Sequence, residues 1–355
     1  MLRVVFFINT KAAETMMAHK KLKSLASMFM GALLLTSGAV QAKDMKLRLG
    51  TVYASGHTVV EAAHAMAAEV KERTDGRITI SVFPDSQLGG DVAMGREISR
   101  GSLDMAFLNP NSLAGLDSRF DFHQLPYIVR NFEEADQIFF NPDGIIQKNM
   151  SEVLNDHKMK PLAFFENEFR ALTNSEREVR TMDDIEGLKL RIVSSEAFKV
   201  FFEELGVYAV AMPFPELFTA LQQGTVDGQD NGPAMTYNSR LFEAQKFMTI
   251  LNHAYAIGAV VISERAWNRL SDEDKQVLQE VAVKVTAEQV PKNRQMSDEY
   301  LANIEKSGVQ IHRLSDEEMA PFVDAASRAW AKLEKTYGKE KMETLRGELN
   351  AMRGE

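Results

Sequence analysis

Residues 187–233 constrain the fold more than any other stretch, because they predict five consecutive elements in the order strand, helix, strand, helix, strand. Along the first of these strands, Leu188, Leu190 and Ile192 alternate with other residues, which is the period of two that a β-strand imposes. Strands and helices that alternate in this way are typical of α/β proteins.

Arg191 lies within that first strand, between apolar neighbours. A guanidinium held there requires an anion, because an unpaired charge is costly to remove from water. The anion can be a carboxylate of the protein or one of a ligand, and the planar fork of Arg binds either with two parallel hydrogen bonds. We expect a ligand carboxylate.

The first hundred residues of the mature chain show the same alternation. Strands are predicted at 47–50, 78–82 and 103–107, and helices at 58–73 and from Asp91, as the N-cap, to Ser99 with Gly101 closing it. This order predicts a largely parallel sheet, in which ligands bind beyond the carboxyl ends of the strands. Asn109 follows such an end and is a pocket candidate; the alternative is an Asn that only favours the turn.

The later part of the chain predicts a crossing between domains and a long helix. We expect an irregular crossing at 170–179, a strand at 256–262, and a helical pattern from Ser271 to Lys306. Pro291 should kink or break that helix, because a proline removes a backbone hydrogen bond and clashes with the preceding turn. A further helix fits 316–337, and the polar tail is expected to fray.

The N-terminal 42 residues are typical of a secretory signal peptide. Closely spaced lysines precede an apolar run from Leu25 to Val40, and small residues then lead to Ala42. We expect cleavage after Ala42, export across the membrane, and a true start at Met16 or Met17. A permanent anchor is the alternative, but the run is short for a membrane span.

Charge and composition exclude several function classes. Without residues 1–42, the 41 Lys and Arg and 50 Asp and Glu become 36 and 49, a net charge of −13, which argues against nucleic-acid binding. The chain has no Cys and none of the common nucleotide-binding or hydrolase motifs, so we predict no enzyme, no catalytic residue and no cofactor. Asp117, Asp121 and His123 match no metal-ligand spacing and are expected on a solvated loop, so no metal is predicted.

Several motifs resemble those of the substrate-binding proteins of TRAP transporters, the tripartite ATP-independent periplasmic systems. The matching stretches are Gly187–Arg191, Leu205–Gly206, Met212–Phe218 and Ala220–Gln229, together with Ser86–Gly90 and Asp183–Ile185. The stretch ALQQGTVDGQ at 220–229 is the most specific of them, and the resemblance extends over essentially the whole mature chain.

The resemblance implies a two-lobe α/β periplasmic-binding-protein (Venus-flytrap) fold that closes by a hinge on a ligand in the cleft, with a long helix spanning both lobes. Lobe I is expected to comprise 43–167 and 256–296, and lobe II 168–255 and 297–355. The ligand would be a small organic acid, either a sugar acid such as a uronate or aldonate or a dicarboxylate. The partner would be the membrane subunits of a TRAP permease, and we expect a monomer.

The resemblance also implies roles for two arginines. Arg191 would hold the ligand carboxylate, with a structural ion pair as the alternative. Arg170 corresponds to a second frequent Arg of the family, and its alternative is an ion pair with Glu166 or Glu168 across solvent.

The other ligand-binding candidates are uncharged or weakly basic. Asn231 would be a polar partner of the carboxylate, or an Asn in a glycine-flanked turn. Phe214 would pack on the ligand body, or belong to the core. Ser194 and Gln87 are polar cleft candidates that favour a hydroxylated acid, and His57, in the first strand–helix loop, is either a hydrogen-bond donor or a surface His.

The chain departs from the family pattern at positions near the expected cleft. Val193, Ala209 and Ala211 stand where prolines are usual, and Glu168 stands where Gly is usual. Asn109 stands where sialic-acid-binding relatives have an acidic residue. These departures bear on the identity of the ligand rather than on the fold.

Two other function classes stay open. A module that presents its ligand to a sensor would have the same sequence features. A secreted enzyme acting on an anionic substrate would need a general base with a nucleophile or a metal in the cleft, and the sequence offers neither.

Overall fold

The computed structural model describes residues 44–354, and residues 44–355 form one compact unit. The predicted signal peptide and its cleavage site lie outside the described residues. In the described part of the chain, no helix is both long enough and apolar enough to cross a bilayer.

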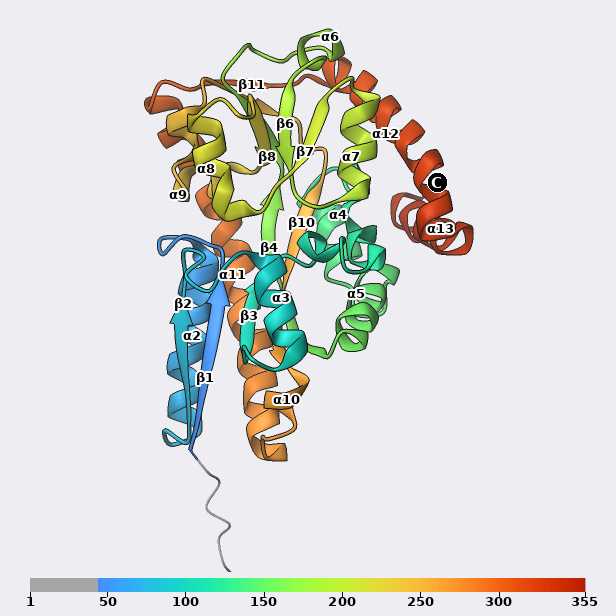
Figure 1. Ribbon diagram of the computed structural model, residues 1–355. Coiled ribbons are helices and arrows are strands. Elements are labelled where there is room, and N and C mark those ends of the chain that lie inside the picture. Colours follow the sequence, from blue (N-terminus) through green and yellow to red (C-terminus); the bar gives the residue numbers. More distant parts are fainter. Residues whose placement is uncertain (1–43, 355) are drawn as a thin grey trace, which may run out of the picture. The chain divides into compact units, whose positions relative to one another are not determined.

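The first sheet has five strands in the order β2-β1-β3-β10-β4 (Figure 1). Its strands are β1 (Met45–Thr51), β2 (Ile78–Phe83), β3 (Met105–Leu108), β4 (Met159–Phe169) and β10 (Tyr255–Ser263). β1 pairs in parallel with β2 and β3, whereas β10 is antiparallel to both β3 and β4, so the sheet is mixed rather than largely parallel. All nine residues of β10 are buried, as expected for a strand with neighbours on both edges.

The second sheet has six strands in the order β11-β9-β5-β8-β6-β7. Its strands are β5 (Ala171–Asn174), β6 (Lys189–Ile192), β7 (Tyr208–Ala211), β8 (Gly228–Asn231), β9 (Phe247–Ile250) and β11 (Gln310–Arg313). β6 pairs in parallel with β7 and β8, and β5 is antiparallel to β8 and β9. The five elements predicted at 187–233 are confirmed in type and order.

Helices cover the sheets and supply much of each core. Those packed on the first sheet are α2 (Thr58–Arg73), α3 (Asp91–Arg100), α5 (Ile145–Asp156) and α11 (Asp272–Lys306), with the short α10 (Glu264–Trp267). The second core includes residues of α4 (Phe132–Phe139), α6 (Met182–Ile185), α7 (Glu196–Glu204), α12 (Asp316–Tyr337) and α13 (Lys339–Arg353). The remaining helical elements are α8 (Phe214–Gln222), α9 (Pro233–Asn238), η1 (Pro110–Leu113), η2 (Ser118–Gln124) and η3 (Leu241–Ala244).

Three segments connect the two sheets. The chain passes from β4 to β5 through Arg170 and returns from β9 to β10, and α11 contacts α2 and β4 on one side and α9 on the other. The long helix therefore spans both lobes, as the resemblance implies. Of the kink or break predicted at Pro291, the break is wrong, since α11 continues through the proline as one helix. Gln289 and Asn293 on either side of the proline bond to residues of β4, and these tertiary contacts hold the helix in place.

Several local predictions need correction. The crossing at 170–179 contains the buried strand β5 and is not wholly irregular. The tail does not fray: residues 339–353 form α13, which buries Met342, Leu345 and Leu349. The segment that carries Asp121 and His123 is not a solvated loop, because both side chains are buried in η2. Burial lowers the pKa of His123 to about 3, so that ring is neutral at physiological pH.

The start of α3 also differs from the prediction. Asp91 is the first helical residue, and Gly90 occupies the N-cap position without a side-chain hydrogen bond. The predicted end is confirmed, since Gly101 adopts a left-handed conformation with φ of 72°. The Asp91 side chain is therefore available for another role.

Candidate functional site

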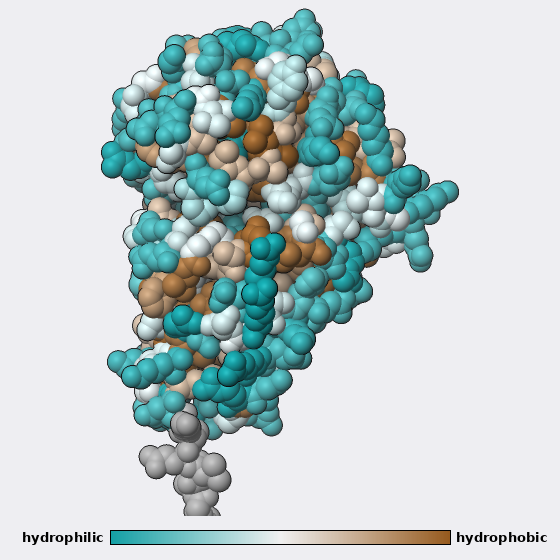
Figure 2. All heavy atoms as spheres, in the orientation of Figure 1, coloured by the Kyte–Doolittle hydropathy of each residue, from teal (hydrophilic) through white to brown (hydrophobic). Residues whose placement is uncertain are grey.

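Two adjoining cavities are lined by residues from both lobes, the one built around the first sheet and the one built around the second sheet. The inner cavity, of about 20 Å³, is lined by Val52, Asp91, Asn109, Asn111, Ser112, Asn167, Arg170, Arg191, Val193, Phe214, Asn231 and Met235. The outer cavity, of about 530 Å³, shares Asp91, Ser112, Arg191, Val193 and Phe214 with it and adds Gly90, Val92, Ala93, Arg96, Ser194, Ala211, Met212, Pro213, Pro215 and Glu216. In Figure 2, brown and white surface lies across the middle of the view, between more strongly teal regions.

The cavity sizes have a consequence for ligand entry. The inner cavity is close to the volume that holds one water molecule, whereas the outer one lies in the usual range for a small-molecule site. A carboxylate is larger than a water, so a ligand reaches the inner cavity only when its walls move apart. That motion corresponds to the hinge opening expected of two lobes joined by three segments.

Arg191 is the central cation of these cavities. Leu190 and Ile192 are buried in the second core, while Arg191, 1% exposed, lines both cavities. Its Nε and Nη2 atoms donate to the backbone carbonyl of Met212 at 2.9 and 2.7 Å, and its Nη1 atom has no hydrogen-bond partner among the described residues. One edge of the guanidinium is thus fixed by the backbone, and the other edge carries an unused donor.

The electrostatics of Arg191 favour an anionic ligand. Burial lowers its pKa to about 10, so the guanidinium is still protonated at pH 7. It forms no ion pair with a carboxylate within the range 44–354 and instead lies 5.9 Å from the ring centre of Phe214. A buried cation whose partners are a carbonyl and an aromatic ring retains most of its capacity to bind a carboxylate.

Arg170 is held by its own acidic partner. It is 3% exposed, and its Nε donates to Oδ2 of Asp230 at 2.9 Å while Nη2 bonds to the Asp230 carbonyl. His253 contacts the same carboxylate oxygen at 3.3 Å, and Phe198 packs under the guanidinium at 5.2 Å. The alternative predicted for Arg170, an ion pair with Glu166 or Glu168 across solvent, is wrong. The ion pair is with Asp230, and both side chains are buried.

Asn231 and Phe214 both reach the inner cavity. Asn231 ends β8, and its side chain accepts from Arg170 at 3.2 Å and donates to Gln229 at 2.5 Å. Phe214 begins α8 and packs against two hydrophobic clusters as well as lining the cavities. The Phe214 ring therefore belongs both to the hydrophobic packing and to the cavity wall.

Asp91 and Asn109 form the opposite wall. The Asp91 carboxylate accepts from the backbone N–H and side-chain Nδ2 of Asn109 at 3.2 and 3.1 Å and from the Ser112 hydroxyl at 3.2 Å. The Asn109 oxygen in turn accepts from the Tyr53 hydroxyl at 2.7 Å and from Asn167 at 3.1 Å. Burial raises the pKa of Asp91 to about 6, so the group is mostly ionised at neutral pH.

The remaining candidates lie apart from the inner cavity. Ser194 lines the outer cavity. Gln87 is exposed and is not among the residues that line either cavity. The expectation of a surface His57 is wrong: the side chain is buried and caps α2 by accepting from the Val59 N–H at 3.2 Å, and burial lowers its pKa to about 3.

Three site residues were not singled out from the sequence. Asp91 was explained by a capping role, and Ser112 and Asn167 carried no motif. For Ser112 the available signal is its position shortly after the strand predicted at 103–107, where pocket residues gather in α/β proteins.

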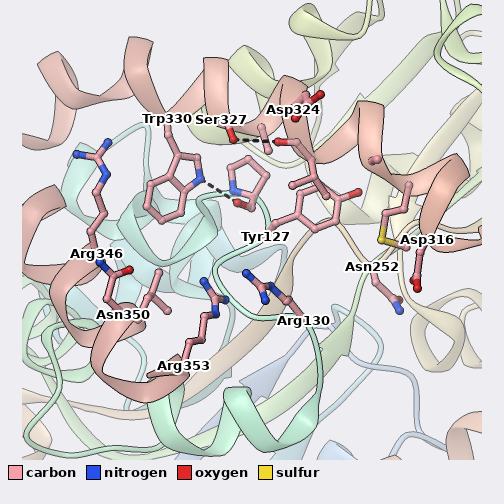
Figure 3. Close-up of a pocket in the computed structure, with 16 residues that line it drawn as sticks. Tyr127, Arg130, Asn252, Asp316, Asp324, Ser327, Trp330, Arg346, Asn350 and Arg353 are labelled. Carbon is pink, nitrogen blue, oxygen red and sulfur yellow. Dashed lines mark hydrogen bonds between the residues drawn. The ribbon is translucent and has the colours of Figure 1, made fainter. Parts of the chain in front are cut away.

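A larger cavity, of about 770 Å³, lies elsewhere, between α12, α13 and residues 126–130 (Figure 3). Its arginines serve the fold: Arg353 bonds to Glu134 and to the Ile128 carbonyl, and Arg346 bonds to Glu334 beside the Trp330 ring. No buried polar atom without a partner lines it within residues 44–354. We therefore place the candidate site at Arg191 rather than in the larger groove.

The chemistry available at the site is anion binding. Across residues 44–354, no cluster of His, Cys, Asp or Glu is arranged to hold a metal ion. The cavities offer guanidinium, amide and hydroxyl groups, with one carboxylate at Asp91.

Comparison with known proteins agrees with this interpretation. The family model for the bacterial extracellular solute-binding proteins of family 7 matches residues 49–336. The 2,3-diketo-L-gulonate-binding periplasmic protein YiaO of Escherichia coli is 30% identical over 256 residues, which cover 72% of this chain and 76% of YiaO. The C4-dicarboxylate-binding protein DctB of Bacillus subtilis is 27% identical and covers 83% of this chain and 85% of its own.

A solved structure extends the comparison to three dimensions. The sugar acid binding protein DctPAm from Advenella mimigardefordensis, in complex with galactonate, matches with a TM-score of 0.83 at 29% identity. The match covers 88% of this chain and 99% of that one. The two-lobe architecture expected from the sequence is thereby confirmed.

Proposed function

This chain belongs to family 7 of the bacterial extracellular solute-binding proteins, the solute receptors of TRAP transporters, and from that premise we propose that Arg191 anchors the carboxylate of a small organic acid in the cleft. Relatives are named for sugar acids and for C4-dicarboxylates, and we assign this chain a ligand within those classes. The candidates proposed to surround the ligand are Arg170, Asn231, Phe214 and Asn109.

A single observation carries the proposal. The Nη1 atom of Arg191 is buried, without a partner among residues 44–354, and on the wall shared by both cavities. A buried donor without a partner costs about 1–3 kcal/mol, and more when it is charged, so an unpaired donor on a cavity wall favours a ligand that accepts a hydrogen bond from it. A carboxylate is the complementary group for a guanidinium edge.

The remaining elements of the role are proposals that derive from family membership. Family members are periplasmic, and we propose export by a signal peptide cleaved after Ala42, delivery of the acid to TRAP membrane subunits, and action as a monomer without catalysis. We also propose the lobe boundaries 43–167 with 256–296 and 168–255 with 297–355. Arg170 and the β9–β10 connection would then lie at the hinge.

A thermal-shift screen of organic acids tests the proposal. A ligand at 100 times its Kd should stabilise the wild-type protein by about 2.7 kcal/mol. Arg191→Ala should lose this shift, and Arg191→Lys should retain only part of it, because an ammonium cannot take both the carbonyl and the ligand in the geometry of a fork. Arg100→Ala, at an exposed arginine on α3, is the matched control and should respond as the wild type does.

Full ligand stabilisation in Arg191→Ala would remove this residue from its role. A screen without any stabilising acid would oppose the assignment of an organic acid altogether. Turnover of a bound acid would favour a secreted enzyme over a receptor.

A further inference from the structure

We propose that Asp91 makes the cleft selective for hydroxylated monocarboxylates, such as aldonates, over dicarboxylates and aldarates. This inference rests on the proposed function, because it assumes that one carboxylate of the ligand binds Arg191. It concerns the groups that the rest of the ligand meets.

Asp91 lies on the walls of the two cavities that Arg191 also lines, within reach of a ligand bound there. The side chain, 6% exposed, belongs to the wall of both cavities, as does Arg191. The two residues come from different lobes: Asp91 begins α3, which packs on the first sheet, and Arg191 lies in β6 of the second sheet. A ligand that reaches Arg191 is therefore enclosed between a guanidinium on one side and a carboxylate on the other.

The Asp91 carboxylate has capacity left for a ligand donor. A carboxylate offers about four acceptor positions, and three are occupied by the N–H groups of Asn109 and the hydroxyl of Ser112. It forms no ion pair with a cation in the described part of the chain. A ligand hydroxyl can donate to the free position, which gives a charge-assisted hydrogen bond.

Asn167 adds a second acceptor on the same wall. Its Nδ2 donates to Asn109 at 3.1 Å, while its Oδ1 is buried and has no hydrogen-bond partner among the described residues. The side chain is 4% exposed and lines the inner cavity. Two fully buried side-chain atoms that line this cavity, Asn167 Oδ1 and Arg191 Nη1, have no hydrogen-bond partner among residues 44–354, and they call for a donor and an acceptor in one ligand.

This arrangement distinguishes ligands by the groups that they carry beyond the first carboxylate. Hydroxyl groups supply the donors that Asp91 and Asn167 require. A second carboxylate supplies only acceptors and places a like charge against Asp91 where little water screens it. Because burial raises the pKa of Asp91 only to about 6, the group is largely ionised at pH 7.5 and repels that second charge.

Arg96 does not remove the discrimination. It lines the outer cavity and is exposed, so its charge is screened by solvent. It is not among the residues of the inner cavity, where Asp91 and Asn167 lie. A second carboxylate near Arg96 would belong to a ligand that extends out of the inner cavity.

The test uses pairs of acids that differ only at the terminal carbon. D-Galactonate and galactarate, and D-erythronate and meso-tartrate, each exchange a terminal CH₂OH for a carboxylate. Isothermal titration at pH 7.5 with the mature wild-type protein should show the monocarboxylate of a bound pair binding at least about 10-fold more tightly. Asp91→Asn should reduce that ratio by about 10- to 100-fold, because the charge is removed at nearly constant shape.

The control variant is Asp143→Asn, which neutralises an exposed aspartate in the loop between α4 and α5 and should leave the ratio unchanged. If Asp91→Asn does not fold, the wild-type ratio decides alone. Wild-type protein that binds a dicarboxylate or aldarate as tightly as its monocarboxylate partner overturns this inference and leaves the proposed function standing. Wild-type protein that binds none of these acids, nor any other in a carboxylate screen, overturns the proposed function and with it this inference.

Discussion

The buried ion pair beneath the site provides a quantitative test of the structure. Asp230→Asn removes the charge that Arg170 faces and keeps the shape of the side chain. Asp230 is fully buried, and its carboxylate contacts Arg170 at 2.9 Å and His253 at 3.3 Å. Burial raises the pKa of Asp230, but the Arg170 charge and the His253 hydrogen bond outweigh burial and hold the pKa below its ordinary value.

The expected loss follows from the solvent exclusion of both partners. The side chains of Arg170 and Asp230 are 3% and 0% exposed, so neutralising one leaves the other as a buried unpaired charge. Breaking such a pair costs about 3–5 kcal/mol, and we expect about 3 because Asn still accepts one hydrogen bond. At an unfolding entropy of about 2.1 cal/mol/K per residue, a chain of about 310 residues shifts by about 1.5 °C per kcal/mol, so the melting temperature should fall by about 4–5 °C.

Urea unfolding followed by far-UV circular dichroism measures this loss. The midpoint should fall without a change in the m-value, and the control variant Asp143→Asn should stay within about 0.5 kcal/mol of the wild type. Because the folded-state pKa of Asp230 is depressed, its contribution is present above about pH 4 and is lost as the pH falls through the folded value. A loss below about 1 kcal/mol at pH 7 would refute the reasoning, because that is the range of solvent-exposed pairs.

Two further predictions concern the buried end of β4 and the core of the first sheet. Burial raises the pKa of Glu168 to about 8 in the folded protein, above its unfolded value near 4.5. The contribution of Glu168 to stability is therefore complete below about pH 4.5 and is lost as the pH rises through about 8. Glu168→Gln should flatten the fall in melting temperature between these two pH values. A Cβ on Gly258 would lie 2.0 Å from the Phe165 ring, so Gly258→Ala should destabilise by about 1–3 kcal/mol or more in urea unfolding. Gly347→Ala is the matched control, since it adds a Cβ in open space within α13 and should stabilise by about 0.5–1 kcal/mol.

Periodicity predicted most of the fold because it reports burial directly. The alternation at Leu188–Ile192 identified β6, and the helical pattern from Ser271 to Lys306 identified α11. β9 and β11, at one edge of the second sheet, were not predicted.

Local rules failed where tertiary contacts decide the outcome. Pro291 interrupts the hydrogen bonding of α11, yet side chains on both sides of it bond to β4 and the helix continues. The tail was read as polar, although Met342, Leu345 and Leu349 have the helical spacing that buries one face of α13. The helical spacing of these apolar residues was present in the sequence, but the many polar residues of the tail led to the prediction that it frays.

The residues of the candidate site also differ in whether the sequence could predict them. Arg191 was predictable because a charge within an apolar strand has no local explanation. Asp91 was not, because an Asp at the start of a helix already has a sufficient local explanation as a cap. Its position against Arg191 depends on how α3 packs across the cleft, which no pattern along the chain records.

A crystal structure of the mature protein with its organic acid bound tests the central claim most directly. A ligand carboxylate oxygen should lie within about 3.2 Å of Arg191 Nη1, while Nε and Nη2 keep their bonds to the Met212 carbonyl. A carboxylate bound elsewhere in the cleft, with Nη1 facing water or a protein acid, would contradict the account.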